Sequence, residues 1–176
     1  MKVIYLFILF TSTIKAQIIF DFNNRSNIND WNIVDDVVMG GRSNGNFEIN
    51  SEGHGVFSGY VTTENNGGFS SVRYQFDKVN TTKESKLILH IKGDGKAYQI
   101  RIKDNVNSYY SYITTFETSG EWQKISVPLK DLYPSFRGRT LDLPNYNSAS
   151  FEELAILIGN KKKESFQLII DKMVLE

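Results

Sequence analysis

Two arginines occupy polar positions of short segments that alternate polar and apolar side chains. Arg73 lies in residues 69–76 and Arg101 in residues 98–103. If such strands are neighbours in one sheet, their polar side chains share a face directed away from the core. Arginine and amide donors beside an aromatic edge suit sugar hydroxyls or a carboxylate. The candidate ligand-binding face consists of Arg73, Gln75, His90, Gln99, Arg101 and Tyr109. An ordinary solvated outer face is the alternative, and strand order decides between them.

A serine between two glycines raises the question of a hydrolase. Residues 41–45, Gly-Arg-Ser-Asn-Gly, match the Gly-x-Ser-x-Gly pattern of a nucleophile elbow. That elbow requires a helix directly after the serine. Residues 46–50 alternate like a strand instead, and Asn44-Gly45 is typical of a hairpin turn. We therefore expect no catalytic role for Ser43.

The acidic residues do not predict a glycosidase either. Such enzymes place two carboxylates across a cleft, about 5 Å or 6.5–9.5 Å apart. Asp35 and Asp36 are adjacent, as are Glu152 and Glu153. Adjacent residues of an extended strand point to opposite faces. We expect no catalytic residues and a protein that is not an enzyme.

Residues 31–43, Trp-Asn-Ile-Val-Asp-Asp-Val-Val-Met-Gly-Gly-Arg-Ser, have the most unusual local composition. Two aspartates and a double glycine within an apolar run predict special backbone geometry, with carboxylates accepting hydrogen bonds from nearby amides. Calcium is an alternative, since aspartate oxygens are suitable ligands, but the segment lacks spaced acidic ligands. The chain has no cysteine and two histidines. We expect no metal and no cofactor.

The elements that position these residues are strands. Alternating apolar residues recur in short segments along the chain, and no window of 12 or more residues carries a helical period. Turn signals occur at residues 44–45, 65–68, 93–95 and 119–120. A phosphate-binding loop would require a helix after its glycines, and no helix is expected after Gly93-Asp94-Gly95. That motif therefore predicts a tight turn. Residues 150–154 suggest a helical turn, and residues 133–147 a surface loop or lid. About ten strands predict an all-β fold, an antiparallel β-sandwich of the jelly-roll type.

Charge composition narrows the class of partner. Twenty Lys and Arg residues balance twenty Asp and Glu residues among 176. A balanced chain lacks the positive field that nucleic-acid binding requires. We therefore expect no nucleic-acid partner; composition does not decide the oligomeric state.

The first residues have the pattern of an export signal. Lys2 precedes an apolar run over residues 3–10, and Ala16 follows a more polar stretch. This pattern predicts a signal peptide over residues 1–16, cleaved after Ala16, and an exported single domain over residues 17–176, periplasmic or secreted. The run is shorter than the roughly 20 residues of a membrane-spanning helix, so the mature chain is not expected to span a membrane. An uncleaved anchor is the alternative.

Several short motifs follow one another along the chain: residues 31–43, Gly67-Gly68-Phe69, Gly93-Asp94-Gly95, Trp122 and Arg137-Gly138. In this order they resemble the motifs of the complex I intermediate-associated protein 30 family. The resemblance covers about residues 18–176 and implies a galactose-binding-domain-like β-sandwich. It also implies a structural role for the motif residues, with Asp35, Asp36, Gly40 and Gly41 shaping the first hairpin. The motif residues are Trp31, Asp35, Asp36, Met39, Gly40, Gly41, Ser43, Gly67, Gly68, Phe69, Gly93, Asp94, Gly95, Trp122, Arg137 and Gly138.

Two functions follow as expectations. The family is named for a chaperone of respiratory complex I assembly, which implies a non-catalytic module binding a protein partner in an envelope or respiratory assembly. Its interaction surface would include residues 133–147. The alternative is an exported carbohydrate-binding module that holds a glycan on the polar sheet face.

Overall fold

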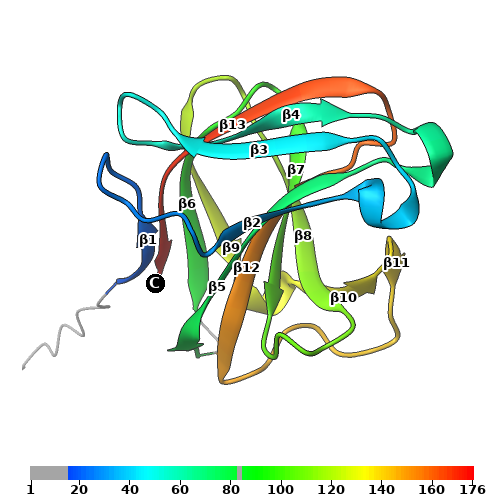
Figure 1. The fold of residues 1–176 in the computed structure, drawn as a ribbon. Helices are drawn as coiled ribbons and strands as arrows, with labels where there is room; N and C mark the ends of the chain where they lie inside the picture. The colour runs from blue at the N-terminus through cyan, green and yellow to red at the C-terminus, as the bar shows by residue number, and fades with distance from the viewer. Residues whose placement is uncertain (1–15, 83–84) are drawn as a thin grey trace, which may run out of the picture.

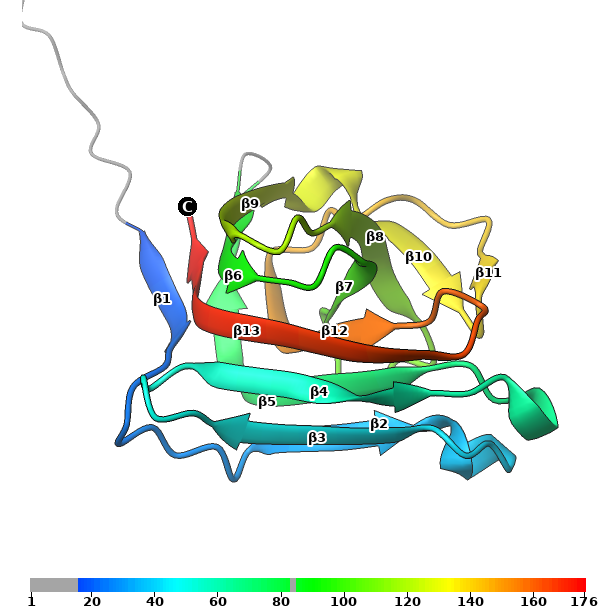
Figure 2. The ribbon, with the colours of Figure 1, turned by 90° about the horizontal axis from the view of Figure 1, so that it is seen from above.

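A computed structural model describes residues 16–82 and 85–176 and shows two antiparallel sheets stacked as layers (Figures 1 and 2). This confirms the predicted β-sandwich. The first sheet has the order β3-β4-β13-β6-β9, with β1 paired to β13. Its strands are β1 (Gln17–Asp21), β3 (Asn44–Ile49), β4 (Gly55–Val61), β6 (Lys86–Lys92), β9 (Trp122–Pro128) and β13 (Glu164–Leu175). The predicted signal peptide lies outside the described residues except for Ala16, and it stays a prediction.

The second sheet has the order β11-β10-β8-β7-β12-β5-β2. Its strands are β2 (Trp31–Asp35), β5 (Ser70–Asn80), β7 (Ala97–Lys103), β8 (Ser111–Glu117), β10 (Tyr133–Phe136), β11 (Arg139–Thr140) and β12 (Ser150–Ile158). Three short 3-10 helices complete the described elements: η1 (Asp36–Met39), η2 (Glu64–Asn66) and η3 (Leu129–Asp131). Within residues 16–82 and 85–176, no helix is long and apolar enough to cross a membrane.

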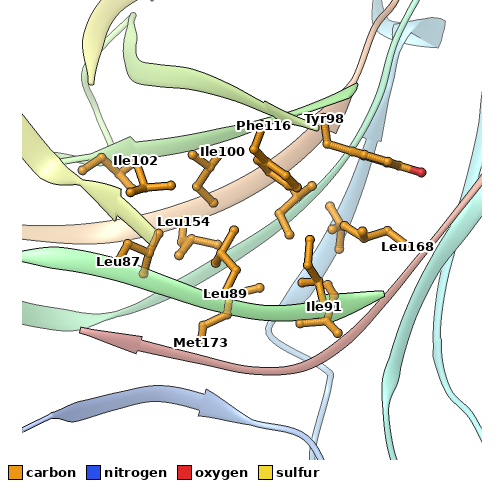
Figure 3. Packing of buried hydrophobic residues seen from close by; sticks show 14 of the residues in the cluster. Leu87, Leu89, Ile91, Tyr98, Ile100, Ile102, Phe116, Leu154, Leu168 and Met173 are labelled. Atoms are coloured by element: carbon orange, nitrogen blue, oxygen red, sulfur yellow. The ribbon is translucent and has the colours of Figure 1, made fainter. Parts of the chain in front are cut away.

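The core fills the space between the two sheets. Figure 3 shows Leu87, Leu89 and Ile91 of β6 packed toward Ile100 and Ile102 of β7, all of them buried. These residues occupy the apolar positions of the alternating pattern, so their polar neighbours are left on the outer faces. Burial of each such side chain contributes about 1.5–3 kcal/mol to the free energy of unfolding.

Three local predictions were wrong. Residues 150–154 begin strand β12 rather than a helical turn, because β12 lies between β5 and β7 and both neighbours hydrogen-bond its backbone. Residues 133–147 include the hairpin β10–β11, because β10 pairs with the edge of β8. Asn44 and Gly45 are the first residues of β3 rather than a turn; a Cβ on Gly45 would lie 2.2 Å from the hydroxyl oxygen of Ser70, so the glycine permits close packing.

The Gly93-Asp94-Gly95 turn ties the two sheets together. It connects β6 of the first sheet to β7 of the second. The Tyr98 hydroxyl on β7 donates to Asp94 Oδ1 (3.0 Å), and the backbone N–H of Gln167 on β13 donates to Asp94 Oδ2 (2.9 Å). Burial of Tyr98, followed by the charge of Asp94, raises the pKa of the phenol above its ordinary value. The Tyr98 ring lies within the core while its oxygen points away from the apolar side chains (Figure 3).

Replacing Tyr98 with phenylalanine tests this link. Tyr98→Phe keeps the buried ring and removes one hydrogen bond to a carboxylate, so we expect the free energy of unfolding to fall by about 1.5–3 kcal/mol in urea denaturation. The matched control is Tyr109→Phe, since the Tyr109 side chain is exposed, and its change should stay within about 0.5 kcal/mol. Equal stability of Tyr98→Phe and the wild type would show that the Asp94 contact does not hold the sheets.

Candidate ligand-binding groove

The two arginines of the predicted face lie on the second sheet with one strand between them. Ala155 of β12 pairs with Arg73 of β5 on one side and with Arg101 of β7 on the other. The three residues therefore form one row across the outer face, and the two arginine Cα atoms are about 10 Å apart, two strand spacings. Ala155 itself is buried, whereas both arginines reach the surface of this face.

A groove of about 480 Å³ crosses this face. Four of the six predicted residues line it: Arg73, Gln99, Arg101 and Tyr109. The other lining residues are Thr63, Gly67, Gly68, Phe69, Lys103, Ser111, Ser135, Phe136, Arg137, Gly138, Leu157, Gly159 and Lys161. The row through Ala155 belongs to the rigid sheet, whereas the walls come from the η2 loop and the β10–β11 hairpin, which lie on the same side of the molecule (Figure 1).

One wall is aromatic and cationic. Tyr109 is 63% exposed, and its ring centroid lies 5.3 Å from that of Phe136 in an edge-to-face arrangement. The Arg137 guanidinium lies 5.2 Å from the centroid of the Phe136 ring. Arg137 and Gly138 form the β10–β11 turn with positive φ angles of 49° and 76°. This hairpin places a flat ring and a charged fork side by side at the groove.

The opposite wall is held by a buried carboxylate. Asp36 is fully buried, and its Oδ2 accepts hydrogen bonds from the N–H groups of Gly68 (2.6 Å) and Phe69 (3.2 Å). The Ser43 hydroxyl also donates to Oδ2 (2.5 Å), and the Ser43 N–H donates to Oδ1 (3.0 Å). Burial raises the pKa of Asp36, but the hydrogen bonds from Ser43, Gly68 and Phe69 outweigh it and hold that pKa below its ordinary value. Asp36 therefore stays ionised and fixes the segment that lines the groove.

Two glycines make room for this carboxylate. A Cβ on Gly41 would lie 2.2 Å from Asp36 Oδ1, and one on Gly67 would lie 2.6 Å from Oδ2. Gly40 ends η1 with a φ of 88°, a conformation that favours glycine. The neighbouring Asp35 accepts a hydrogen bond from the Gly45 N–H (3.0 Å). The spacing of the two aspartates and the double glycine thus follows from packing around Asp36. Of the same motif, the Met39 side chain lies outside the described part of the chain.

Neither calcium nor a serine nucleophile fits this cluster. Both oxygens of Asp36 already accept hydrogen bonds, and residues 16–82 and 85–176 contain no group of three or more potential metal-ligating His, Cys, Asp or Glu side chains. Ser43 is buried; its hydroxyl donates to Asp36 and accepts from the Thr62 N–H (3.0 Å). Strand β3, not a helix, follows Ser43.

The groove is strongly cationic. Five of its lining residues are arginine or lysine, and among the described residues none of the lining is acidic. Glu153 lies beside the groove, 3.9 Å from Arg73 by the closest N–O distance, and accepts a hydrogen bond from Gln75 Nε2 (2.8 Å). Gln75 thus lies next to the groove and not in its lining. Burial, followed by the charge of Arg73, lowers the pKa of Arg101 to about 10, so Arg101 remains charged at neutral pH.

The prediction for His90 was wrong. His90 lies on β6 of the first sheet, which does not pair with β5 or β7. Strand β6 alternates apolar and polar residues just as the two arginine strands do, so the sequence alone does not show which sheet contains His90. There, His90 lines a separate hollow of about 450 Å³ together with His54 and Trp122. Trp122 is 47% exposed, and its ring is tilted by 58° against that of His54, with the centroids 4.9 Å apart.

Sequence reasoning also missed part of the groove. Gly67, Gly68, Phe69, Arg137 and Gly138 were expected to be structural, yet they line it. Polar alternation identifies Lys103 on β7 as an outward-facing residue, a signal that was available. The remaining wall residues come from loops and an edge hairpin, whose approach to the sheet no local pattern encodes.

Comparison with known sequences identifies relatives of this chain. The model of the family described as complex I intermediate-associated protein 30 matches residues 20–170. A mitochondrial protein of that name from Drosophila melanogaster is 23% identical over 150 residues, which cover 73% of this chain and 51% of the relative. The chain therefore spans about half the length of this curated relative.

Solved structures with low sequence identity share the sandwich. A family 11 carbohydrate-binding module from Clostridium thermocellum, in complex with a β-1,3-1,4-mixed-linked tetrasaccharide, is 15% identical with a TM-score of 0.68; the match covers 93% of this chain and 96% of the module. An agarase is 13% identical with a TM-score of 0.59, covering 92% of this chain and 24% of the agarase. At these identities the likeness establishes the fold alone.

Changing Asp36 to asparagine tests the carboxylate that holds the glycine wall. Asp36→Asn removes the charge and aims an amide N–H₂ at donors, so we expect the free energy of unfolding at pH 7 to fall by about 2–3 kcal/mol. Because the folded pKa of Asp36 lies below its unfolded value, its stabilisation is present above pH 3.8 and is lost as the pH falls through the folded pKa. The gap between wild type and variant should therefore narrow in urea titrations below about pH 4. The control is Asp142→Asn at an exposed position; a gap independent of pH would contradict the assignment.

Proposed function

The chain belongs to the complex I intermediate-associated protein 30 family, and we propose that it is a non-catalytic binding protein that holds an oligosaccharide in the groove of its second sheet. The observation that carries the proposal is the row of Arg73, Ala155 and Arg101 on the outer sheet face, beside the exposed ring of Tyr109. A flat, rigid floor with forked donors and an aromatic wall matches the shape and the hydroxyl groups of a sugar chain.

The chemistry of the lining supports binding to a saccharide. Arg101 and Gln99 supply N–H donors to the groove. Ser111 and Ser135 also line it, but both residues are buried. Leu157 adds an apolar patch on the same face, suited to the C–H faces of a sugar ring. The fold shared with a carbohydrate-binding module solved with a bound tetrasaccharide is further support by analogy.

Binding without catalysis is part of the proposal. Hydrolysis of a glycosidic bond requires two carboxyl groups flanking it, and the described lining of the groove supplies none. Glu153, the nearby carboxylate, is 4% exposed and engaged by Gln75 and Arg73. The groove therefore has the groups to hold a sugar chain but not the pair that would cleave it.

A protein partner is the second candidate. The observation that favours it is the sequence relationship to a mitochondrial protein named for association with a complex I intermediate. An extended peptide would also fit an open groove with backbone and side-chain donors. A lack of stabilisation by any glycan, together with capture of one defined protein by the purified domain, would favour this candidate.

Export is proposed as well, because cleavage after Ala16 leaves strand β1 whole, beginning at Gln17. Expression of residues 1–176 in a bacterial host should yield a product of residues 17–176 outside the cytoplasm, as measured by intact mass spectrometry of the fractions. Removal of residues 1–15 should retain the protein in the cytoplasm. A full-length product in the membrane fraction would indicate an uncleaved anchor instead.

Glycan binding is tested by thermal unfolding and calorimetry with purified residues 17–176. Probes are the mixed-linkage glucan tetrasaccharide, agaro-oligosaccharides and oligogalacturonate; at least one should raise the unfolding midpoint as its concentration increases. Tyr109→Ala should weaken that binding about tenfold while leaving the midpoint of the free protein unchanged.

The matched control is Trp122→Ala, because Trp122 is an exposed aromatic residue on the other sheet. Affinity should be unchanged in this variant. Loss of binding in Trp122→Ala with retention in Tyr109→Ala would move the site to the hollow beside His90. No midpoint shift with any probe would contradict the glycan proposal.

A further inference from the structure

We infer that the saccharide held in the groove is acidic, with a carboxylate or sulfate group bound between Arg73 and Arg101. This inference rests on the proposed function and specifies its ligand. Its first basis is the composition of the groove: Arg73, Arg101, Lys103, Arg137 and Lys161 line it, and within the described residues no acidic side chain does. The whole chain has a formal net charge of zero, so this charge is concentrated locally.

The second basis is that Arg101 lacks a counterion. Its polar contact is a hydrogen bond from Nη1 to Gln99 Oε1 (3.4 Å), and among the described residues no carboxylate lies within ion-pair distance of it. Burial costs the Arg101 charge its hydration, and the attraction of Glu153 offsets only part of that cost, because the pKa of Arg101 stays below its ordinary value. Arg73, one strand further on, adds like-charge repulsion. A bound anion removes both costs.

The carboxylate of Glu153 does not fill this role. Glu153 lies in the neighbouring row of the sheet, paired with Gln75 and Lys103, whereas Ala155 lies between the arginines. Its Oε2 accepts from Gln75, and its Oε1 is 3.9 Å from Arg73 Nη1, beyond hydrogen-bond distance. Arg73 Nε has no acceptor among the described residues. Both guanidinium groups therefore retain donors for an anion from outside the chain.

The position between the two arginines follows from sheet geometry. Their Cα atoms are about 10 Å apart, and both residues line the groove, so the two guanidinium groups can approach one anion from opposite sides. A guanidinium offers two parallel N–H donors to a carboxylate or sulfate. The rings of Tyr109 and Phe136 line the same groove and can contact the sugar that carries the anion.

Calorimetry with matched acidic and neutral oligosaccharides tests the inference. Oligogalacturonate is compared with its methyl ester, which has the same backbone without charge, and a sulfated galactan oligosaccharide is compared with a neutral agaro-oligosaccharide. We expect an acidic member to bind at least about 30-fold more tightly than its neutral partner, as for charged hydrogen-bonded contacts, and salt to weaken it. The pair that responds distinguishes carboxylate from sulfate.

Substitutions of Arg101 test whether this residue binds the anion. Arg101→Gln should weaken binding of the acidic probe about 30-fold or more, and it should not lower the unfolding midpoint, since it removes an unpaired charge. Arg101→Lys keeps the charge and should restore part of the affinity and the salt dependence. The matched control is Lys124→Gln on the first sheet, which should bind as the wild type does.

Each outcome decides between the two proposals. Tight binding of neutral oligosaccharides without preference for acidic ones would overturn the acidic ligand and leave the glycan site in place. Failure of every saccharide would overturn both. Equal binding of an oligoglutamate peptide would replace the saccharide with an acidic protein segment, and acidic-probe binding unchanged by Arg101→Gln would remove the anion from this row.

Discussion

A carboxylate taken out of water must have all of its acceptor capacity used, and this requirement at Asp36 organises one end of the molecule. The donors that meet it come from Ser43 and from the Gly68–Phe69 backbone, segments far apart in the sequence. Their convergence is possible only because Gly41 and Gly67 leave room beside the oxygens. The same hydrogen bonds place the segment that forms one wall of the groove. Stability and binding surface therefore depend on one side chain.

The floor of the groove, the row of residues across β5, β12 and β7, is positioned by the sheet and not by a buried charge. Ala155, Arg73 and Arg101 are positioned by sheet register, which is set by burial of their inward-facing neighbours. Asp94 adds a polar link between the sheets at the β6–β7 turn. The floor is thus positioned by the paired strands of the sheet, whereas the walls come from the η2 loop and the β10–β11 hairpin. Loops on a fixed sheet are a common way for one fold to present different surfaces.

The sequence predicted the architecture more completely than the site. Alternation identified the strands and placed Arg73 and Arg101 on an outer face, because the period of two is a local property. It could not separate His90 from them, since the assignment of β6 to the other sheet depends on long-range pairing. The wall formed by Phe136 and Arg137 comes from an edge hairpin within a segment that reads as irregular. The motif residues Gly67 and Gly68 drew attention through composition, but only the hydrogen bonds from Gly68 and Phe69 to Asp36 reveal that this motif serves both the fold and the groove.

The central strand of the groove, β12, is nearly the last strand in the chain, yet it separates β5 from β7. During synthesis, Arg73 and Arg101 therefore precede Ala155, the residue that pairs with both of them. Strands β5 and β7 are joined in one sheet only when β12 has paired with each of them. Pairings of this kind slow folding, and a chain that ends before β12 lacks the strand that brings the two arginines into one row.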